Sequence, residues 1–487
     1  MRIIDVAKRE EKLIYREIYP LREPYAYAAI VEDPETHEIR YLVMEPKLTD
    51  SEKEIYERLV KILLEELKYP PKSLGSDELA EKYLREEAER VVKKYRIKVS
   101  PSSFDKIFYY LCRDMLYYGK IDPFMRDPYI EDISCDGPGR PIYVWHRKYE
   151  SIPTNVRYET PQELDSFVVR LAYICGRHIS IAQPMVDASL PDGSRINITY
   201  STEVTKGGST FTIRKFRADP ITIIDILNFG TISVDVATYF WFLVEHKKSL
   251  MIAGATASGK TTMLNAISTF IKPGLKIVTI EDTPELNLPH ENWIQSVARV
   301  GFGGRRDITL FDLLEAAMRQ RPDYVIVGEI RGAEAYTLFQ ALATGHGGLC
   351  TIHADSISGI IHRLTTDPMN IPKQLIPAMN VMMVQIRTTK GRKPIRRTKI
   401  ISEIVDYDKR TGELMTNVVF RWDPRTDSFA YTGRSYIVER IRREEGYTRS
   451  FIEEEFERRK LILKWMQKDK IRSYKEVARM IKAYYLT

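Results

Sequence analysis

One run of residues has the types and the spacing needed to hold phosphate. It consists of Gly254, Ala255, Thr256, Ala257, Ser258, Gly259, Lys260, Thr261 and Thr262. Glycines let the backbone wrap around phosphate oxygens, and successive N–H groups at a helix N-terminus supply positive potential. Lys260 is placed to reach the outer phosphates, and Thr261 to put its hydroxyl on Mg²⁺. An apolar run precedes the loop and a helix-like run follows it, so the sequence predicts a site for a nucleoside triphosphate with Mg²⁺.

Polar residues follow three further apolar, strand-like runs. Glu281 follows residues 277–280, Glu329 comes two positions after residues 324–327, and His353 follows residues 350–352. Because the carboxyl ends of parallel strands meet at one edge of a sheet, we expect these side chains to lie near the phosphate loop.

Each of these side chains has a proposed role and a plainer alternative. Glu329 would orient the attacking water, or act through water on Mg²⁺, and would otherwise be a solvated carboxylate at a strand end. Glu281 would polarise water or support the metal, unless residues 282–285 form a turn and helix cap. His353 would sense the γ-phosphate, with His346 a weaker candidate, and its alternative is a structural histidine.

Basic residues outside the loop are candidates for contacts with other charges. Arg195, Arg214 and Arg217 could complete the site as arginine fingers, or could be surface arginines on a β-sheet. The basic segment 387–399 could approach acidic lipid or an acidic partner, or form a solvated face.

Composition bounds the class of protein. The chain has 487 residues, 44% of them hydrophobic, and a formal net charge of +7, which does not by itself indicate a nucleic-acid partner. No uncharged apolar run approaches the ~20 residues of a membrane span, and no apolar signal core opens the chain. We therefore expect a cytoplasmic protein. The cysteines lack CxxC spacing, so we expect neither a disulfide framework nor a zinc module; they are Cys112, Cys135, Cys175 and Cys350.

The chain must supply elements to position these residues. In its first part we expect two strands within 26–44, a helix capped by Thr49-x-x-Glu52, and helices over 78–95 and 104–118. An α+β region follows over 127–216, then a linker. From residue 234 apolar strand-like runs alternate with helices, as in a parallel sheet covered on both faces. Beyond residue 400 we expect short strands and then charged helices, with capping boxes at Ser450-x-x-Glu453 and Ser473-x-x-Glu476.

Four ordered motifs resemble those of the secretion-motor ATPases that drive type II secretion, type IV pili and archaeal surface filaments. They are the phosphate loop, an acidic box at 280–286, the stretch 321–332 with Gly328-Glu329-Ile330-Arg331-Gly332, and a histidine box at 344–354. The resemblance extends upstream and covers roughly 122–404. This chain lacks the four-cysteine module of many bacterial members, and this absence points to the archaeal branch.

The resemblance implies a fold with a RecA-like, phosphate-loop parallel sheet preceded by a smaller PAS-like α+β domain. The implied segments are a mainly helical extension with a β-hairpin (1–121), the α+β domain (122–216), a linker (217–233), the ATPase core (234–410) and C-terminal strands with a helical tail (411–487).

The resemblance also implies function. Its members are hexameric rings that bind ATP and Mg²⁺, the latter through the positions of Thr261 and Glu329. Arginines matching Arg195, Arg214 and Arg217 reach the phosphates of another subunit. We expect a cytoplasmic homo-hexamer, at the inner face of the membrane, that pushes on an integral membrane platform protein and takes no nucleic acid. The alternatives are a nucleic-acid translocase and a scaffold that binds ATP without useful hydrolysis.

Overall fold

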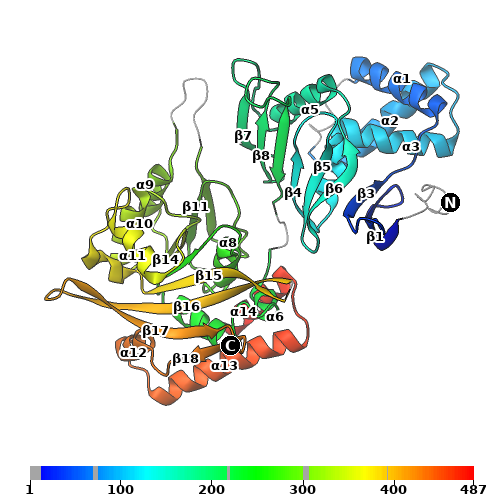
Figure 1. Ribbon diagram of the computed structural model, residues 1–487. Helices are drawn as coiled ribbons and strands as arrows, with labels where there is room; N and C mark the ends of the chain where they lie inside the picture. The colour runs from blue at the N-terminus through cyan, green and yellow to red at the C-terminus, as the bar shows by residue number, and fades with distance from the viewer. Residues whose placement is uncertain are drawn as a thin grey trace. The chain divides into compact units, whose positions relative to one another are not determined.

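The computed structural model describes residues 13–67, 69, 75–216, 220–299, 307–391 and 393–486. The chain forms two compact units, Met1–Phe216 and Arg217–Thr487. Each unit contains one nine-stranded sheet with helices (Figure 1), so the expectation of a mixed α/β protein is confirmed. The RecA-like and PAS-like assignments and the five segment bounds stay predictions.

The sheet of the first unit is antiparallel except where β3 meets β6. Its strand order is β1-β2-β3-β6-β5-β4-β9-β8-β7. The expected hairpin within 26–44 is present as β2 and β3, and it joins this sheet through a pairing of Tyr41 with Thr154. The strands are β1 (Ile14–Arg22), β2 (Ala26–Glu32), β3 (Ile39–Met44), β4 (Ile130–Cys135), β5 (Pro141–His146), β6 (Glu150–Arg157), β7 (Met185–Ser189), β8 (Arg195–Thr199) and β9 (Thr210–Arg214).

Four of the five α-helices described in the first unit begin at a residue whose side chain caps the helix. The capping box of Thr49 and Glu52 is confirmed, because each side chain accepts a hydrogen bond from the other residue's backbone N–H. The predicted helix over 104–118 is instead an α-helix to Leu111 followed by a π-helical turn, Cys112–Leu116. The α-helices are α1 (Asp50–Glu66), α2 (Asp77–Lys94), α3 (Pro101–Leu111), α4 (Asp122–Arg126) and α5 (Pro161–Ile174). Helices α1, α2 and α3 share a core of their own.

The sheet of the second unit is parallel from β12 to β15 and antiparallel from β15 to β18. Its order is β12-β11-β13-β14-β10-β15-β16-β17-β18. The four strands predicted from apolar runs are confirmed as β10 (Leu250–Gly254), β11 (Ile277–Glu281), β13 (Tyr324–Val327) and β14 (Gly347–Ile352). The other strands are β12 (Trp293–Val297), β15 (Val381–Lys390), β16 (Lys393–Asp408), β17 (Glu413–Asp423) and β18 (Ser428–Tyr431).

Helices cover both faces of this second sheet (Figure 1). In β10, Leu250 and Ile252 belong to one core and Met251 and Ala253 to the other, because successive side chains in a strand point to opposite faces. One face carries α9 (Leu310–Arg319), α10 (Glu334–Ala343), α11 (Ile357–Thr365) and the 3₁₀ turn Lys373–Ala378. The other carries α6 (Ile223–Asn228), α7 (Val234–Glu245), α8 (Lys260–Ser268), α12 (Tyr436–Glu444), α13 (Arg449–Lys468) and α14 (Tyr474–Tyr484).

The C-terminal part differs from the sequence prediction in two respects. The strands are long: β16 has 16 residues and β17 has 11. Neither predicted capping box forms. Thr448 is the N-cap of α13 and accepts a hydrogen bond from the Phe451 N–H, which places Ser450 inside the first turn. Ser473 is the N-cap of α14, but its side chain makes no cap hydrogen bond.

Within the described part of the chain, no helix combines the length and the apolar character that crossing a membrane requires.

Candidate nucleotide site

The predicted phosphate loop connects β10 to α8. Strand β10 is fully buried and lies fifth in the sheet of nine. A Cβ at Gly254 would lie 2.6 Å from the backbone oxygen of Gln385, so no larger residue fits there. Gly259 is the N-cap of α8 and has φ +92°, a left-handed conformation that favours glycine. Both glycines therefore have a geometric reason to be in the loop.

Inside the loop, the carbonyl oxygen of Ala255 accepts three hydrogen bonds. Its donors are Lys260 Nζ at 3.2 Å, Ser258 Oγ at 2.8 Å and the Ser258 N–H at 3.3 Å. Burial lowers the pKa of Lys260, while the negative charge of Glu329 acts in the opposite direction. The ammonium group thus lies within the curve of the loop, where phosphate oxygens would compete for it with a single neutral carbonyl.

His353 connects Lys260 to Glu329. Its Nδ1 lies 3.5 Å from Lys260 Nζ, and its Nε2 lies 3.1 Å from Glu329 Oε1. Partial burial and the nearby Lys260 charge lower the pKa of His353, which favours the neutral imidazole. A neutral ring can accept at Nδ1 and donate at Nε2, so one tautomer satisfies both contacts. Side chains from the ends of β10, β13 and β14 therefore meet, as the sequence predicted.

Glu281 is close to this group, but its own loop occupies its carboxylate. Oε1 accepts from the N–H groups of Glu285 and Leu286 at 2.8 and 2.9 Å, and Oε2 accepts from Gln295 Nε2 at 3.2 Å. Burial raises the pKa of Glu281 to about 7. Its Cγ lies 3.2 Å from where a Cβ of Gly328 would be. Glu281 thus fixes the segment after β11 next to Gly328, and no helix follows residues 282–285, so the helix-cap alternative is wrong.

The arginine candidates belong to the first unit. Arg195 begins β8 and Arg214 ends β9, as paired residues of adjacent strands. Their nearest ion-pair partners, Asp187 and Asp132, are at 3.9 and 4.0 Å, and both arginine side chains are more than half exposed. Arg217 lies outside the described residues. The phosphate loop belongs to the second unit, so the approach of these arginines to a nucleotide stays a prediction.

Two arginines of the basic segment have contacts that the sequence did not predict. Arg396 Nε donates to the carbonyl oxygen of Ala257 at 3.0 Å, inside the phosphate loop. Arg397 is buried and donates to both carboxylate oxygens of Asp427 at 2.7 and 2.9 Å. Most of the described part of this segment is exposed, as expected of a solvated face, but Arg397 is buried within it. No sequence motif could have predicted these contacts, because they depend on how β16 extends the sheet. Arg392 lies outside the described residues.

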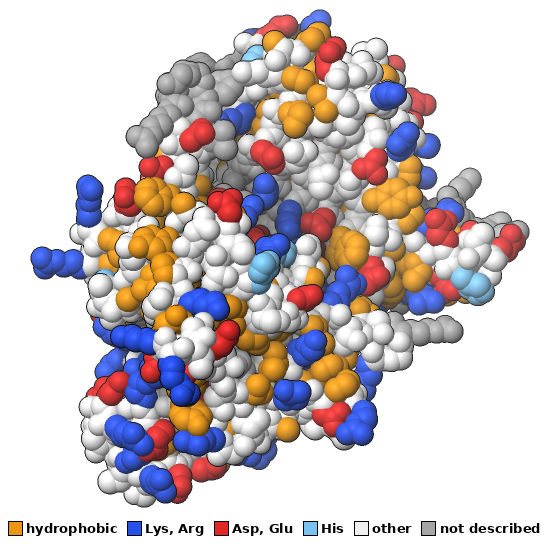
Figure 2. Space-filling model, turned by 60° about the vertical axis from the view of Figure 1, so that its left-hand side comes forward, with side chains coloured by type: hydrophobic (Ala, Val, Ile, Leu, Met, Phe, Trp, Pro, Cys, Tyr) orange, Lys and Arg blue, Asp and Glu red, His pale blue; other side chains and the backbone are white. Residues whose placement is uncertain are grey.

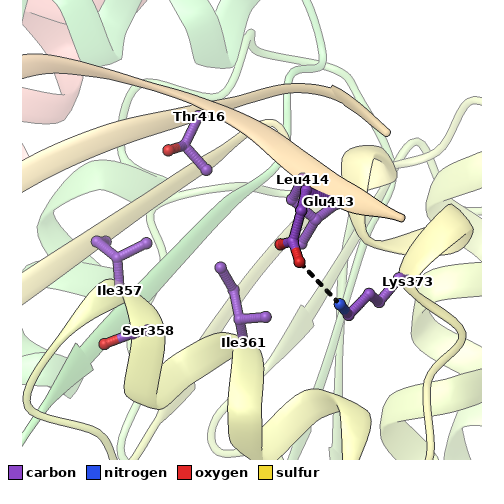
Figure 3. Close-up of a pocket in the computed structure, with 7 residues that line it drawn as sticks. All are labelled: Ile357, Ser358, Ile361, Lys373, Glu413, Leu414 and Thr416. Carbon is purple, nitrogen blue, oxygen red and sulfur yellow. Dashed lines mark ion pairs between the residues drawn. The ribbon is translucent and has the colours of Figure 1, made fainter. Parts of the chain in front are cut away.

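A separate pocket of about 310 Å³ lies between α11 and β17. Figure 3 shows the side chains of Ile357 and Ile361 on α11 pointing toward β17, with Lys373 beside Glu413 at the rim. None of the predicted site residues lines it. Its aliphatic lining residues are Ile357, Ile361 and Leu414, and the polar ones are Ser358, Lys373, Glu413 and Thr416. Its one cation, Lys373, lies beside the carboxylate of Glu413, so we assign the nucleotide to the loop instead.

Comparisons with known proteins agree on one family for this chain. The family model described as "Type II/IV secretion system protein" matches residues 119–482. The chain is 39% identical to "Uncharacterized protein MJ0900" of Methanocaldococcus jannaschii, over 99% of this chain and 91% of that protein. It is 31% identical to "Type IV secretion system protein PtlH" of Bordetella pertussis, over 53% of this chain and 82% of that protein.

Solved structures are similar at lower identity. The X-ray structure of the Legionella pneumophila ATPase DotB matches with 16% identity and a TM-score of 0.45, over 64% of this chain and 83% of that one. The pilus retraction motor PilT with bound ADP matches with 21% identity and a TM-score of 0.41, over 65% and 83%.

Proposed function

The chain belongs to the type II/IV secretion system protein family and is an ATPase of that family; from this premise we propose that it hydrolyses ATP to power assembly of a type IV pilus-like filament or a secretion machine. In this proposal it works as a homo-hexamer at the inner face of the membrane and pushes on an integral membrane platform protein. Residues 234–410 would be the RecA-like motor core and residues 122–216 the PAS-like domain that moves against it.

The contact of His353 with both Lys260 and Glu329 is the observation that carries this proposal. Lys260 is the group that the γ-phosphate would attract, and Glu329 is the carboxylate placed to orient water. Phosphate oxygens bound to Lys260 would neutralise the positive charge that lies beside His353. The hydrogen bond from His353 to Glu329 Oε1 would then depend on whether the γ-phosphate is present. A motor needs such a dependence to couple hydrolysis to movement.

Glu329 would act on the attacking water. Its Oε1 accepts a hydrogen bond from His353, so Oε2 can accept one from a water in line with the γ-phosphate. Glu281 supports this arrangement by fixing the backbone beside Gly328 rather than by touching the water itself.

The residues at the loop fit Mg²⁺. Thr261 is the second residue of α8, and Glu329 interacts electrostatically with the buried Lys260, so a hydroxyl and a carboxylate belong to the same site. Such oxygen donors are those that Mg²⁺ prefers. When bound, the metal would neutralise charge on the β- and γ-phosphates.

Replacement of the carboxylate tests the chemistry. Glu329→Gln should bind MgADP as the wild type does and lose turnover by roughly 100-fold or more, since a positioned base contributes about that much. Glu315→Gln, an exposed carboxylate on α9, is the matched control and should keep full activity. Unchanged turnover in Glu329→Gln would remove this residue from the mechanism.

Ring formation tests the composite site. We expect the specific ATPase activity to rise with protein concentration as light scattering reports assembly. Arg195→Ala should abolish turnover without preventing assembly, whereas Arg157→Ala, an exposed arginine in the same unit, should not. A monomer that hydrolyses ATP at full rate, with Arg195→Ala unchanged, would contradict both the ring and the arginine finger.

The nucleic-acid alternative has less support. Lys and Arg side chains are interspersed with Asp and Glu side chains over the face in Figure 2. The segment 387–399 contains no aromatic residue for base stacking, and its Arg397 is paired with Asp427. Salt-sensitive binding of single-stranded nucleic acid with strong stimulation of the ATPase would favour that alternative.

A further inference from the structure

Arg396 of β16 touches the phosphate loop at two points. Its Nε donates to the Ala257 carbonyl at 3.0 Å, and its Cδ lies 3.2 Å from where a Cβ of Gly259 would be. The aliphatic stem therefore lies over Gly259 while the guanidinium holds the preceding turn. The phosphate-loop pattern assigns no role to Arg396, which lies outside residues 254–262.

A β-bulge in β16 accompanies this placement. Val384 pairs with Ile400 but the next residue, Gln385, pairs with Thr398, so Lys399 is an extra residue in β16. Bulges bend a strand and re-aim its side chains, and they are common next to active sites. Gln385 is also the residue paired with Gly254 at the start of the loop. The bulge therefore lies where β15 runs alongside the phosphate loop.

Arg397 fixes β16 from its opposite face. Its guanidinium pairs with Asp427, and its Nη1 also donates to the backbone oxygens of Phe229 and Arg396, both at 2.9 Å. Asp427 further accepts hydrogen bonds from Lys390 and Trp422, and the Arg397 guanidinium and these donors hold its pKa well below the usual range. The backbone that carries Arg396 is thereby anchored, so its side chain approaches the loop from a fixed point.

Arg396 contacts the Ala257–Ser258 peptide, whose orientation decides whether the Ser258 N–H faces the inside of the loop. Ala257 has φ +60°, a left-handed conformation that is unfavourable for a residue with a Cβ. A trans peptide is planar with its C=O and N–H opposed, so fixing the Ala257 carbonyl outward fixes the Ser258 N–H inward. That N–H now points to Ala255 O at 3.3 Å, inside the curve of the loop.

We propose that Arg396 is a positioning residue of the phosphate loop, which holds the Ala257–Ser258 peptide with its N–H facing the phosphate. The inference rests on the proposed nucleotide site and adds a residue from outside the loop to it. Arg396 acts through Ala257, and it offsets the cost of the left-handed conformation there. The cradle is then formed before the nucleotide arrives, which lowers the ordering cost of binding.

The test compares Arg396→Gln with the wild type and with Lys409→Gln, an exposed cation just beyond the other end of β16. We expect Arg396→Gln to raise the dissociation constant of MgADP about five- to tenfold, as for loss of one ordinary hydrogen bond. The melting temperature should be unchanged because Arg396 is exposed. KM for ATP should rise with kcat nearly constant, because the contact is made before and during turnover. Lys409→Gln should bind as the wild type does.

Two further measurements decide between positioning and simple attraction. Hydrogen exchange of residues 255–262 in the nucleotide-free protein should be faster in Arg396→Gln than in the wild type. Unchanged exchange would overturn the proposal, because a guanidinium that bound phosphate directly would leave the empty loop as it is. A binding deficit that disappears at high salt would also overturn it, since long-range attraction is screened.

The proposal of the nucleotide site can be wrong independently of the proposal about Arg396. If the wild type binds no MgADP, that proposal is wrong, while the exchange comparison still decides whether Arg396 orders the loop.

Discussion

At the scale of single residues, Glu281 holds a buried carboxylate at the candidate site. It is 2% exposed and accepts hydrogen bonds from the N–H groups of Glu285, Leu286 and Gln295.

Glu281 should make stability depend on pH. Burial raises its pKa to about 7 from 4.5, so the folded protein retains a proton that the unfolded chain releases. The stability associated with this proton is present below pH 4.5 and is lost as pH rises through about 7. The loss at pH 8 is about 3 kcal/mol at most, because 2.5 pKa units correspond to roughly that free energy.

We therefore expect Glu281→Gln to gain stability relative to the wild type between pH 5 and pH 8. Calorimetric melting at four pH values would measure this, with Glu315→Gln as the control that shifts in parallel with the wild type. A constant difference between Glu281→Gln and the wild type across that range would show that Glu281 titrates normally.

Some contacts of the site could be predicted from the sequence and others could not. Glu329 and His353 follow neighbouring parallel strands, so their contact follows from topology once the strands are known. The surroundings of Glu281 and Arg396 depend on the path of residues 282–286 and on the bulge in β16, and neither leaves a periodic pattern in the sequence.

At the scale of elements, fully apolar strands were predictable, whereas the edge strand β12 and the lengths of β16 and β17 were not. Strands β10, β11, β13 and β14 are apolar runs buried on both faces. Strand β12 was missed because it is an edge strand, half exposed, with little apolar pattern. The cap of α13 shows the same limit, since Thr448 and Ser450 both have hydroxyl groups and only the backbone path selects Thr448.

The cap of α13 gives a prediction at this scale. Thr448→Ala should lower the free energy of unfolding of the second unit by about 1 kcal/mol, because its hydroxyl accepts the Phe451 N–H. Ser450→Ala, inside the first turn, should change it by less than about 0.5 kcal/mol. Urea denaturation of both variants would check the assignment, and equal losses would restore the cap predicted from the sequence.

At the scale of the whole molecule, the C-terminal helices are part of the second unit's core. Trp241 of α7 stacks on Phe270 at 5.0 Å, lies 4.8 Å from the Tyr484 ring and donates to the Tyr485 hydroxyl at 2.9 Å. Arg459 of α13 is only 1% exposed and pairs with Glu245 of α7 and with Glu455. The sequence predicted only that these helices are charged and form a tail, and it did not identify the apolar face that packs against α7.

Removal of the Arg459 charge should destabilise the second unit. Arg459→Met leaves Glu245 and Glu455 without their partner, and breaking a buried pair in this way costs about 3 kcal/mol. Lys464→Met, on an exposed position of the same helix, should change stability little. Thermal unfolding followed by tryptophan fluorescence would compare them, and similar melting temperatures would mean that the ion pairs of Arg459 contribute little to stability.

The central position of β10 also has a consequence for synthesis of the protein. Both of its neighbours come later in the chain: β14 pairs through residues 349–352, and β15 pairs up to Gln385. A nascent chain must therefore leave the ribosome past residue 385 before β10 is flanked on both sides, and past Arg396 before that side chain can reach the loop. Translation products that end before Val381 should consequently leave β10 without one of its two neighbouring strands, and we expect them not to bind nucleotide.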